Sequence, residues 1–278
     1  ELMVNFFLLR DSSHTKIPSV DDTKVWPSVD IYIACYNEPE DLIYKTVNAC
    51  TFLNYPDKNK VFIHICDDKR RDDLKELANK LKVNYITRPN NEHAKAGNLN
   101  NAFKKTSADL VVTLDADMIV HPNFLLKTVP FFLADEKMAF VQVPHHFYNP
   151  DTFQYNMFAE ESIPNEQDFF HTSIQNGRSK YNAVIYAGSN TVLSRSALEA
   201  TGGFETGTIT EDIATGMKLQ AKGYTSAFVN EVLAIGLAPF NIKDLFNQRI
   251  RWAVGAIQTL RKRSGYYSAL NIKQKLIY

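Results

Sequence analysis

The sequence predicts an α/β fold in which a mostly parallel central sheet is covered by helices on both faces. Two observations lead to this fold class. Short apolar segments of strand length alternate with segments whose apolar residues recur at helical spacing. The 278 residues are 45% apolar with only 11 Gly and 11 Pro, which is typical of a globular chain without low-complexity segments. We therefore expect one large α/β domain.

The first half of the chain contains four predicted strands, at residues 29–35, 61–66, 83–86 and 110–114. Helical spacing predicts a helix over residues 40–53 between the first two strands, and helices are also predicted over the charged residues 72–81 and over residues 95–105. Polar segments follow three of the strands, at residues 36–38, 67–68 and 115–117. Because ligands of such sheets bind outside the carboxyl ends of the strands, we expect these segments to gather along one edge.

Two carboxylates, Asp115 and Asp117, interrupt the apolar stretch 110–120. Burying an unpaired carboxylate costs several kcal/mol, so the pair needs a compensating cation or a place at the open end of the strand. On an extended backbone, side chains at i and i+2 leave the same face about 7 Å apart. One hydrated Mg²⁺ or Mn²⁺ can bridge that distance and favours carboxylate and phosphate oxygens. Two solvated aspartates in a turn are the alternative interpretation.

No nucleotide-binding glycine motif is present: the first strand is not followed by G-x-G-x-x-G, and G-x-x-x-x-G-K-[ST] does not occur. Acidic residues take that place instead, and Asp67 or Asp68 could accept hydrogen bonds from a base or a ribose. Lys95 opens a predicted helix, where a cation and free backbone N–H groups together suit phosphate. A solvated surface lysine is the alternative.

The second half of the chain adds two further candidate segments. A strand is predicted over residues 183–187, leading into the small-residue turn Gly188-Ser189, where a ligand could approach the backbone. Thr210, Glu211 and Asp212 then start a helix that runs to about residue 222, with Thr210 as the expected N-cap. Acidic residues in a first turn are also expected from the helix dipole alone.

A third segment, the amphipathic helix predicted over residues 245–260, carries Gln248, Arg251 and Trp252 on one face. An indole can stack on the C–H groups of a sugar, while an amide and a guanidinium bind its hydroxyls or a phosphate. A tryptophan that only packs the helix onto the protein body is the alternative.

Charge and cysteine content exclude some classes and favour others. Thirty-one basic and thirty-one acidic residues cancel, so global charge gives no argument for a nucleic-acid partner. Residues 248–278 hold seven basic residues and no acidic one, which fits interfacial helices on an anionic membrane, with a solvated basic helix end as the alternative. Cys35, Cys50 and Cys66 lack metal-like spacing and are expected to be buried free thiols in a reducing cytosol. No apolar run is long enough to span a bilayer.

The ordered motifs resemble those of processive inverting family-two glycosyltransferases, and most closely the bacterial cellulose synthase catalytic subunits. The segments Asp67-Asp68, Asp115-Ala116-Asp117, Thr210-Glu211-Asp212 and Gln248-Arg249-Ile250-Arg251-Trp252 look like the D, DxD, TED and QxxRW motifs of that family. Segments 93–100, 143–150, 165–170 and 202–204 are also similar, so the resemblance covers residues 29–278. Residues 185–189 depart from the family: Ile-Tyr-Ala-Gly-Ser stands where the cellulose synthases have Phe-Phe-Cys-Gly-Ser.

The resemblance implies a GT-A fold that uses UDP-glucose and Mg²⁺ or Mn²⁺, on the cytoplasmic side of the cell membrane between transmembrane helices outside this chain. It implies residues 1–27 as a juxtamembrane segment, 28–240 as the GT-A domain, and 241–278 as the QxxRW helix with basic interfacial helices.

The resemblance also implies a role for each motif. Asp115 and Asp117 would hold the metal, with Asp115 shared with the sugar or ribose, and Asp212 would be the general base. The resemblance implies uridine contacts for Tyr36, Glu38, Asp67 and Asp68, and diphosphate contacts for Lys95 and Arg251. It also implies a donor contact for Gln248, catalytic positions for Thr210 and Glu211 beside Asp212, and acceptor contacts for Gly188, Ser189 and Trp252.

The implied reaction is inverting transfer of glucose from UDP-glucose to the non-reducing end of a growing β-glucan, with a β-1,4 linkage favoured. One base and a metal suffice for inversion, whereas a retaining hydrolase needs two flanking carboxylates about 5 Å apart. Other β-glucan linkages, a chitin- or hyaluronan-like synthase, and an inactive scaffold that binds nucleotide-sugar or glucan remain alternatives. A sugar nucleotidyltransferase is disfavoured because the first strand is not followed by a Gly-rich basic loop.

Overall fold

The computed structural model describes residues 8–9, 15–21, 23–261 and 265–278. Its strands are β1 (Val29–Cys35), β2 (Val61–Asp67), β3 (Asn84–Ile86), β4 (Leu110–Asp115), β5 (Ile119–Val120), β6 (Met138–Gln142), β7 (His146–Phe147), β8 (Thr191–Ser194), β9 (Thr225–Phe228) and β10 (Ala234–Gly236).

The α-helices are α2 (Glu40–Thr51), α3 (Asp72–Leu81), α4 (Ala94–Lys105), α5 (Phe124–Thr128), α6 (Pro130–Ala134), α7 (Thr152–Asn156), α8 (Gln175–Ser179), α9 (Arg195–Thr201), α10 (Glu211–Ala221), α11 (Ile242–Arg261), α12 (Gly265–Ala269) and α13 (Ile272–Ile277). A 3₁₀-helix spans Lys58–Lys60, and a π-helix, Phe169–Ile174, precedes α8.

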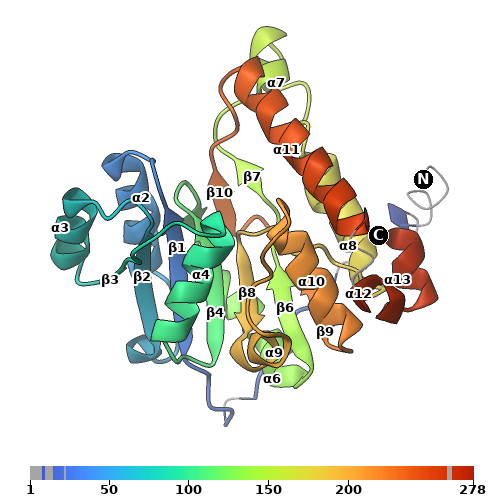
Figure 1. Ribbon diagram of the computed structural model, residues 1–278, viewed down its shortest axis with the longest axis horizontal. Helices are drawn as coiled ribbons and strands as arrows, with labels where there is room; N and C mark the ends of the chain where they lie inside the picture. Colours follow the sequence, from blue (N-terminus) through green and yellow to red (C-terminus); the bar gives the residue numbers. More distant parts are fainter. Residues whose placement is uncertain (1–7, 10–14, 22, 262–264) are drawn as a thin grey trace.

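Seven strands form the central sheet in the order β3-β2-β1-β4-β8-β6-β9 (Figure 1). Strands β1 to β4 pair in parallel, as do β6 and β9, whereas β8 runs antiparallel to both of its neighbours. The register places Ala34 opposite Asp115 and Cys35 opposite Asp67, so the polar ends of β1, β2 and β4 meet at one edge, as predicted. A small sheet, β5-β10-β7, adjoins that edge.

Helices cover both faces of the central sheet because its strands are apolar on both faces. Along β4, Val112 and Leu114 belong to one buried cluster, together with Ile43 of α2 and Leu74 of α3. The intervening Val111 belongs to a second cluster, which includes residues of α4, α9 and α10. The predicted layering is therefore confirmed. The three cysteines are buried and free, as expected.

The predicted strand over residues 183–187 is wrong. Most of this segment is buried, but it pairs with no strand, and side chains satisfy its backbone instead. The Gln175 side chain exchanges two hydrogen bonds with the backbone of Ile185, at 2.8 and 2.9 Å, and the Gln142 side chain accepts one from the amide of Ala187 at 2.9 Å. The strand of this region is β8, which follows the Gly188-Ser189 turn.

Two smaller predictions also need correction. Asp115 ends β4 and Asp117 lies in the turn that follows, where the amide of Met118 donates to the carbonyl of Asp115 at 3.2 Å. The two carboxylates therefore do not share a face of one extended strand. Thr210 holds the N-cap position of α10, but its side chain makes no capping hydrogen bond, because its hydroxyl faces that of Thr259 on α11 at 3.3 Å.

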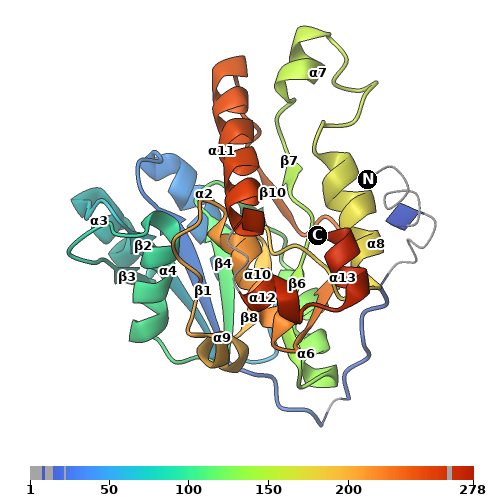
Figure 2. The same ribbon diagram turned by 45° about the vertical axis from the view of Figure 1, so that its right-hand side comes forward.

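The last helices lie beside the body of the domain (Figure 2). In α13, Gln274 donates to the carbonyl of Asn182 at 2.7 Å, and Tyr278 donates to Gln220 of α10 at 2.7 Å. Among the described residues, no helix combines the length and the apolar character that a membrane crossing requires. Lys262 and Arg263 of the predicted basic segment, and much of residues 1–14, lie outside the described residues. The interfacial helices therefore stay a prediction.

Candidate active site

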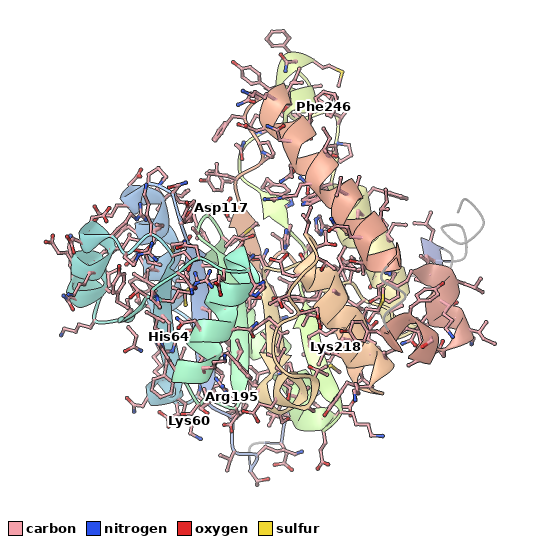
Figure 3. All side chains as sticks on the ribbon, viewed as in Figure 1. Lys60, His64, Asp117, Arg195, Lys218 and Phe246 are labelled. Carbon is pink, nitrogen blue, oxygen red and sulfur yellow. The ribbon has the colours of Figure 1, made fainter. Side chains whose placement is uncertain are left out.

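A cavity of about 850 Å³ opens at the carboxyl edge of the sheet, between β4, α4, α10 and α11. Figure 3 labels Asp117 near the upper end of the central sheet, to the left of helix α11. Ten of the residues predicted from the sequence line the cavity: Glu38, Lys95, Asp115, Asp117, Thr210, Glu211, Asp212, Gln248, Arg251 and Trp252. Residues more than 200 positions apart in the chain are thus brought to one place.

Asp115 and Asp117 both line the cavity. Asp117 accepts a hydrogen bond from the amide of Leu237 at 3.3 Å. Burial and the negative charge of Asp115 raise the pKa of Asp117 to about 6. The raised pKa means that the positive charge nearby does not fully offset the burial of Asp117 and the negative charge of Asp115. Such a site has the chemistry that a divalent cation would complete.

Lys95 supplies the nearest positive charge. Its ammonium group forms an ion pair with Asp115 and donates to the carbonyl of Gly188 at 2.9 Å. Burial by itself would lower the pKa of Lys95, but the charges of Asp115, Asp212 and Glu211 raise it. Lys95 follows His93 and Ala94, which both have positive φ angles, of 60° and 43°. This uncommon backbone turns the chain into α4 with the lysine facing the cavity.

The candidate base, Asp212, lies at the start of α10. Burial and the neighbouring charge of Glu211 raise the pKa of Asp212 to about 6, and the amide of Ile213 donates to it at 2.8 Å. A carboxylate with this pKa can accept a proton near neutral pH. Gly188 makes room for it, because a Cβ atom at that position would lie 2.8 Å from Asp212 Oδ2.

Helix α11 forms the opposite wall with Gln248, Arg251 and Trp252, as its helical spacing predicts. The side-chain oxygen of Gln248 is buried without a hydrogen-bond partner in the structure, so it is available to a ligand. Trp252 also lines an adjoining, mostly apolar cavity of about 470 Å³, which it shares with His145, Phe170 and Asp212. The indole therefore stands between the two cavities.

Five predicted residues lie outside the large cavity, and two of them are Asp67 and Asp68. Asp68 forms a buried two-point ion pair with Arg88, with N–O distances of 2.6 Å. Asp67 accepts from the amide of Arg71 at 2.6 Å and from the Tyr85 hydroxyl at 2.8 Å. Both carboxylates are thus occupied by the protein itself and fix the loop after β2.

The other three are Tyr36, Gly188 and Ser189. Tyr36 is half exposed, and its amide donates to Glu38 at 2.7 Å. Gly188 borders a small cavity beside Asp212 and accepts from Lys95 through its carbonyl oxygen. Ser189 is fully buried, and its hydroxyl accepts from the amide of Asp115 at 2.8 Å. In the structure, Ser189 therefore holds the end of β4 rather than facing either cavity.

Sequence reasoning missed a loop and a histidine. The loop is 206–209, which closes one side of the cavity and holds a buried, unpartnered Thr208 hydroxyl. The amide of Ile209 in this loop donates to Gln258 of α11 at 3.1 Å. The histidine, His145, lines both cavities and stacks on His171 at a ring distance of 4.6 Å. It lies in segment 143–150, which the resemblance had marked without giving it a role.

Taken together, the cavity has one acidic corner, at Asp115 and Asp117, which suits a divalent cation. Within the described part of the chain, no group of three or more His, Cys, Asp or Glu side chains could hold a metal alone. A cation there would need further oxygen ligands from a phosphate or water, which is the usual preference of Mg²⁺. Lys95 and Arg251 offer positive charge to the same phosphates, and Asp212 offers a base nearby.

Solved structures with a similar fold are glycosyltransferases. The mannosyltransferase PcManGT from Pyrobaculum calidifontis, in complex with GDP-Man and Mn²⁺, matches with a TM-score of 0.71 and 20% identity, over 94% of this chain and 71% of that chain. Glucosyl-3-phosphoglycerate synthase from Mycobacterium tuberculosis, in complex with Mg²⁺ and UDP, matches with a TM-score of 0.58 and 19% identity, over 86% of this chain and 80% of that chain. The predicted GT-A fold is confirmed.

Curated relatives are bacterial cellulose synthases. The UDP-forming catalytic subunit from Xanthomonas axonopodis pv. citri is 39% identical over 279 residues, which cover 100% of this chain and 38% of the relative. The subunit from Pseudomonas fluorescens is 41% identical over 236 residues, which cover 85% of this chain and 32% of the relative. The chain thus spans less than two fifths of the length of these relatives.

A family model matches more than half of the chain and therefore identifies its family. The model described as "Glycosyl transferase family group 2" matches residues 110–276, a range that begins with β4 and ends within α13. It includes Asp115, Asp117, Asp212 and the QxxRW segment. The chain therefore belongs to the glycosyl transferase family group 2, with bacterial cellulose synthase catalytic subunits among its relatives.

Proposed function

We propose that the chain is the catalytic domain of a β-glucan synthase. It transfers glucose from UDP-glucose, with inversion, to the non-reducing end of a growing β-1,4-glucan, and it depends on Mg²⁺ or Mn²⁺. The observation that carries the proposal is the meeting of Asp115, Asp117, Lys95, Arg251, Asp212 and Trp252 on the walls of one cavity. The similarity to UDP-forming cellulose synthase subunits supports the choice of donor and product.

The donor diphosphate occupies the corner between β4 and α11. Lys95 and Arg251 bind its oxygens, and the free side-chain oxygen of Gln248 accepts a hydrogen bond from a donor hydroxyl. Asp115 and Asp117 hold the cation, which when bound neutralises charge on the departing diphosphate. The uridine lies towards Glu38 and Tyr36 on the loop after β1, beside the loop after β2 that Asp67 and Asp68 stabilise through their buried contacts.

The acceptor approaches from the Trp252 side, through the adjoining apolar cavity. Its terminal ring stacks on the indole, and its attacking hydroxyl lies against Asp212. As the hydroxyl oxygen bonds to the anomeric carbon, its proton passes to Asp212 and the carbon–oxygen bond to the diphosphate breaks. The charge of Glu211 raises the pKa of Asp212 and the charge of Lys95 lowers it, and the absence of a side chain at Gly188 leaves space for the carboxylate.

The domain works at the cytoplasmic face of the cell membrane, where UDP-glucose is available. The similarity to bacterial cellulose synthase subunits, which are more than twice as long as this chain, supports this placement. Segments outside this chain would hold the domain at the membrane and lead the glucan away from the site.

Linkage analysis tests the proposed product. The full-length protein is incubated with labelled UDP-glucose and Mg²⁺, and the polymer is digested with linkage-specific glucanases. We expect a β-1,4-glucan. A polymer of another linkage would replace the proposed product while keeping the reaction class, and absence of any transfer with an intact fold would contradict the proposed function.

Calorimetric titration with UDP tests the metal site separately. We expect UDP affinity to rise at least tenfold when Mg²⁺ is added, because Mg²⁺ is bound by carboxylates together with phosphates. Asp117→Ala should lose most of this gain. Asp135→Ala is the matched control, since Asp135 lies after α6 and does not line the cavity. A UDP affinity that changes neither on addition of Mg²⁺ nor in Asp117→Ala would refute the metal site.

A further inference from the structure

The indole of Trp252 borders the two cavities and also packs against an arginine side chain. The guanidinium carbon of Arg249, one helical turn earlier on α11, lies 4.3 Å from the centroid of the Trp252 ring. Residues three positions apart lie on the same side of a helix, so this contact follows from the helix itself. A guanidinium at that distance covers one face of the ring, and another ring can stack only on the other face.

Arg249 is itself held from outside α11. Its guanidinium forms an ion pair with Glu166, and both side chains are roughly 30% exposed, at 31% and 28%. Arg249, Glu166 and Trp252 line the same apolar cavity beside Asp212. The arginine is therefore part of the wall of that cavity rather than a solvated charge on the surface of the helix.

Glu166 is fixed in turn by a buried aspartate. The amide of Glu166 donates to Asp151 Oδ2 at 2.8 Å. The other oxygen of Asp151 caps α7 through the amides of Phe153 and Gln154, each at 2.8 Å. A chain of contacts thus runs from the start of α7 through Glu166 and Arg249 to Trp252. Figure 2 shows the segment that carries α7 and α8 running alongside α11.

We infer that Arg249, anchored by Glu166, is a positioning residue that holds the Trp252 indole in place as a one-sided stacking platform for the acceptor sugar. Arg249 does not touch the donor in this scheme, because it lines only the acceptor-side cavity, whereas Arg251 lines the donor side. This inference rests on the proposed function, in which Trp252 binds the acceptor. It assigns Arg249 and Arg251, two residues apart in one motif, to different halves of the reaction.

The test uses the fluorescence of Trp252. The chain has two tryptophans, and the other, Trp26, packs edge-on against Tyr55 at a ring distance of 5.3 Å and lines neither cavity. Trp26→Phe therefore leaves Trp252 as the only reporter in the 278-residue chain. In this background, Arg249→Met removes the charge and the planar group, and Arg249→Lys keeps only the charge. Lys243→Met removes a positive charge elsewhere on α11 as the matched control.

Cellotriose, a soluble β-1,4-linked glucose trimer, is the acceptor probe, and UDP affinity is measured in parallel. We expect Arg249→Met to weaken cellotriose binding by about three- to tenfold, the range of a lost cation–π contact and its ion pair. It should also lower the fluorescence anisotropy of Trp252 and leave UDP affinity within about twofold. Arg249→Lys should have a cellotriose affinity between those of the parent and Arg249→Met, and Lys243→Met should match the parent.

The outcomes separate this inference from the proposed function. If the parent chain binds cellotriose and Arg249→Met changes neither its affinity nor the Trp252 anisotropy, Arg249 has no positioning role and the inference is wrong. An equal loss of UDP and cellotriose affinity in Arg249→Met would also overturn it, because the defect would be general. If the parent chain does not bind cellotriose at all, the acceptor role of Trp252 is wrong, and the inference fails with it.

Discussion

At the scale of single residues, the ionised form of Asp212 lowers the stability of the folded protein. Its folded pKa of about 6 lies above the ordinary value of 3.8. The folded protein therefore holds the proton more tightly than the unfolded chain, and stability falls as pH rises from about 4 to about 6. If Asp212 is the proposed base, its readiness for proton transfer is thus held at the expense of stability.

Replacing Asp212 by Asn should recover that stability. At pH 7 we expect the free energy of unfolding to rise by about 1–2 kcal/mol, less than the full shift implies because the side chain is partly exposed to the cavity. Below about pH 4 the gain should vanish, since Asp212 is then protonated in both states. Urea unfolding at pH 4 and pH 7 measures the difference. A variant that loses stability at pH 7 would contradict the raised pKa.

Alanine variants of two glycines, Gly188 and Gly202, can distinguish the effect of backbone strain from the effect of crowding at Asp212. Gly188 and Gly202 have similar φ angles, of +78° and +85°, but only at Gly188 would a Cβ atom meet another group, namely Asp212 Oδ2 at 2.8 Å. Gly202→Ala should therefore lose about 1–2 kcal/mol, the usual effect of a left-handed alanine. Gly188→Ala should lose more and should also displace the base.

The comparison is made by urea unfolding and by the rate of glucose transfer in each variant. We expect transfer to fall at least tenfold in Gly188→Ala and to stay near the parent rate in Gly202→Ala. Equal transfer rates in the two variants would show that Gly188 is required only for its backbone angle.

At this scale the sequence predicted the cavity-lining side chains well but not the partners of Asp67 and Asp68. Acidic residues after a strand suggest a ligand site, yet Arg88 and Tyr85 lie some 20 positions further along and take up these carboxylates. Spacing along the chain cannot show such a pairing, because it depends on how β3 folds back beside β2.

At the scale of elements, the contact between α10 and α11 sets the position of Asp212, the proposed base, relative to Trp252, the proposed acceptor platform. A Cβ atom at the buried Gly255 of α11 would lie 2.5 Å from Thr210 Cγ2 and 2.8 Å from Thr210 N. The absence of a side chain at Gly255 thus lets α11 approach the residue before Glu211 and Asp212. Hydrogen bonds from Ile209 to Gln258 and between Thr210 and Thr259 reinforce the contact.

Gly255→Ala should therefore behave unlike an ordinary glycine replacement in a helix. Alanine normally stabilises a helix interior by about 1 kcal/mol relative to glycine. Here we expect a net loss of about 1–3 kcal/mol, since the added methyl group forces the two helices apart. Thermal unfolding provides the measurement. Adding Thr210→Ser, which removes the Cγ2 atom, should restore part of the loss. A stabilised Gly255→Ala variant would show that α11 can move away from α10 to accommodate the methyl group without a loss of stability.

The elements also show where sequence patterns are informative. Strands β1, β2, β3 and β4 and helices α2, α3 and α4 were predicted to within two residues at each end, because apolar periodicity is a local property. Residues 183–187 look like a strand for the same reason, since they are apolar and buried. Their backbone, however, is satisfied by the side chains of Gln142, Gln175 and Gln220, which no local pattern reveals.

At the scale of the whole molecule, the site exists only where distant parts of the chain meet. The sheet brings Asp115 and Asp117 to its carboxyl edge, and α10 and α11 bring Asp212 and Trp252 across from it (Figure 1). The resemblance of the ordered motifs indicated which residues belong together. It could not show that Ser189 is buried behind β4, or that loop 206–209 closes the cavity.

In the proposed function, this cavity joins a donor half, which binds UDP and metal, to an acceptor half, in which Asp212 removes a proton. Transfer of labelled glucose by full-length Asp212→Asn, at saturating UDP-glucose and Mg²⁺, is the decisive measurement of this division of roles. We expect UDP affinity to stay within about twofold of the parent and transfer to fall by about 10²–10⁴-fold, the usual effect of losing a general base. Transfer at the parent rate would contradict the role of Asp212 as the general base.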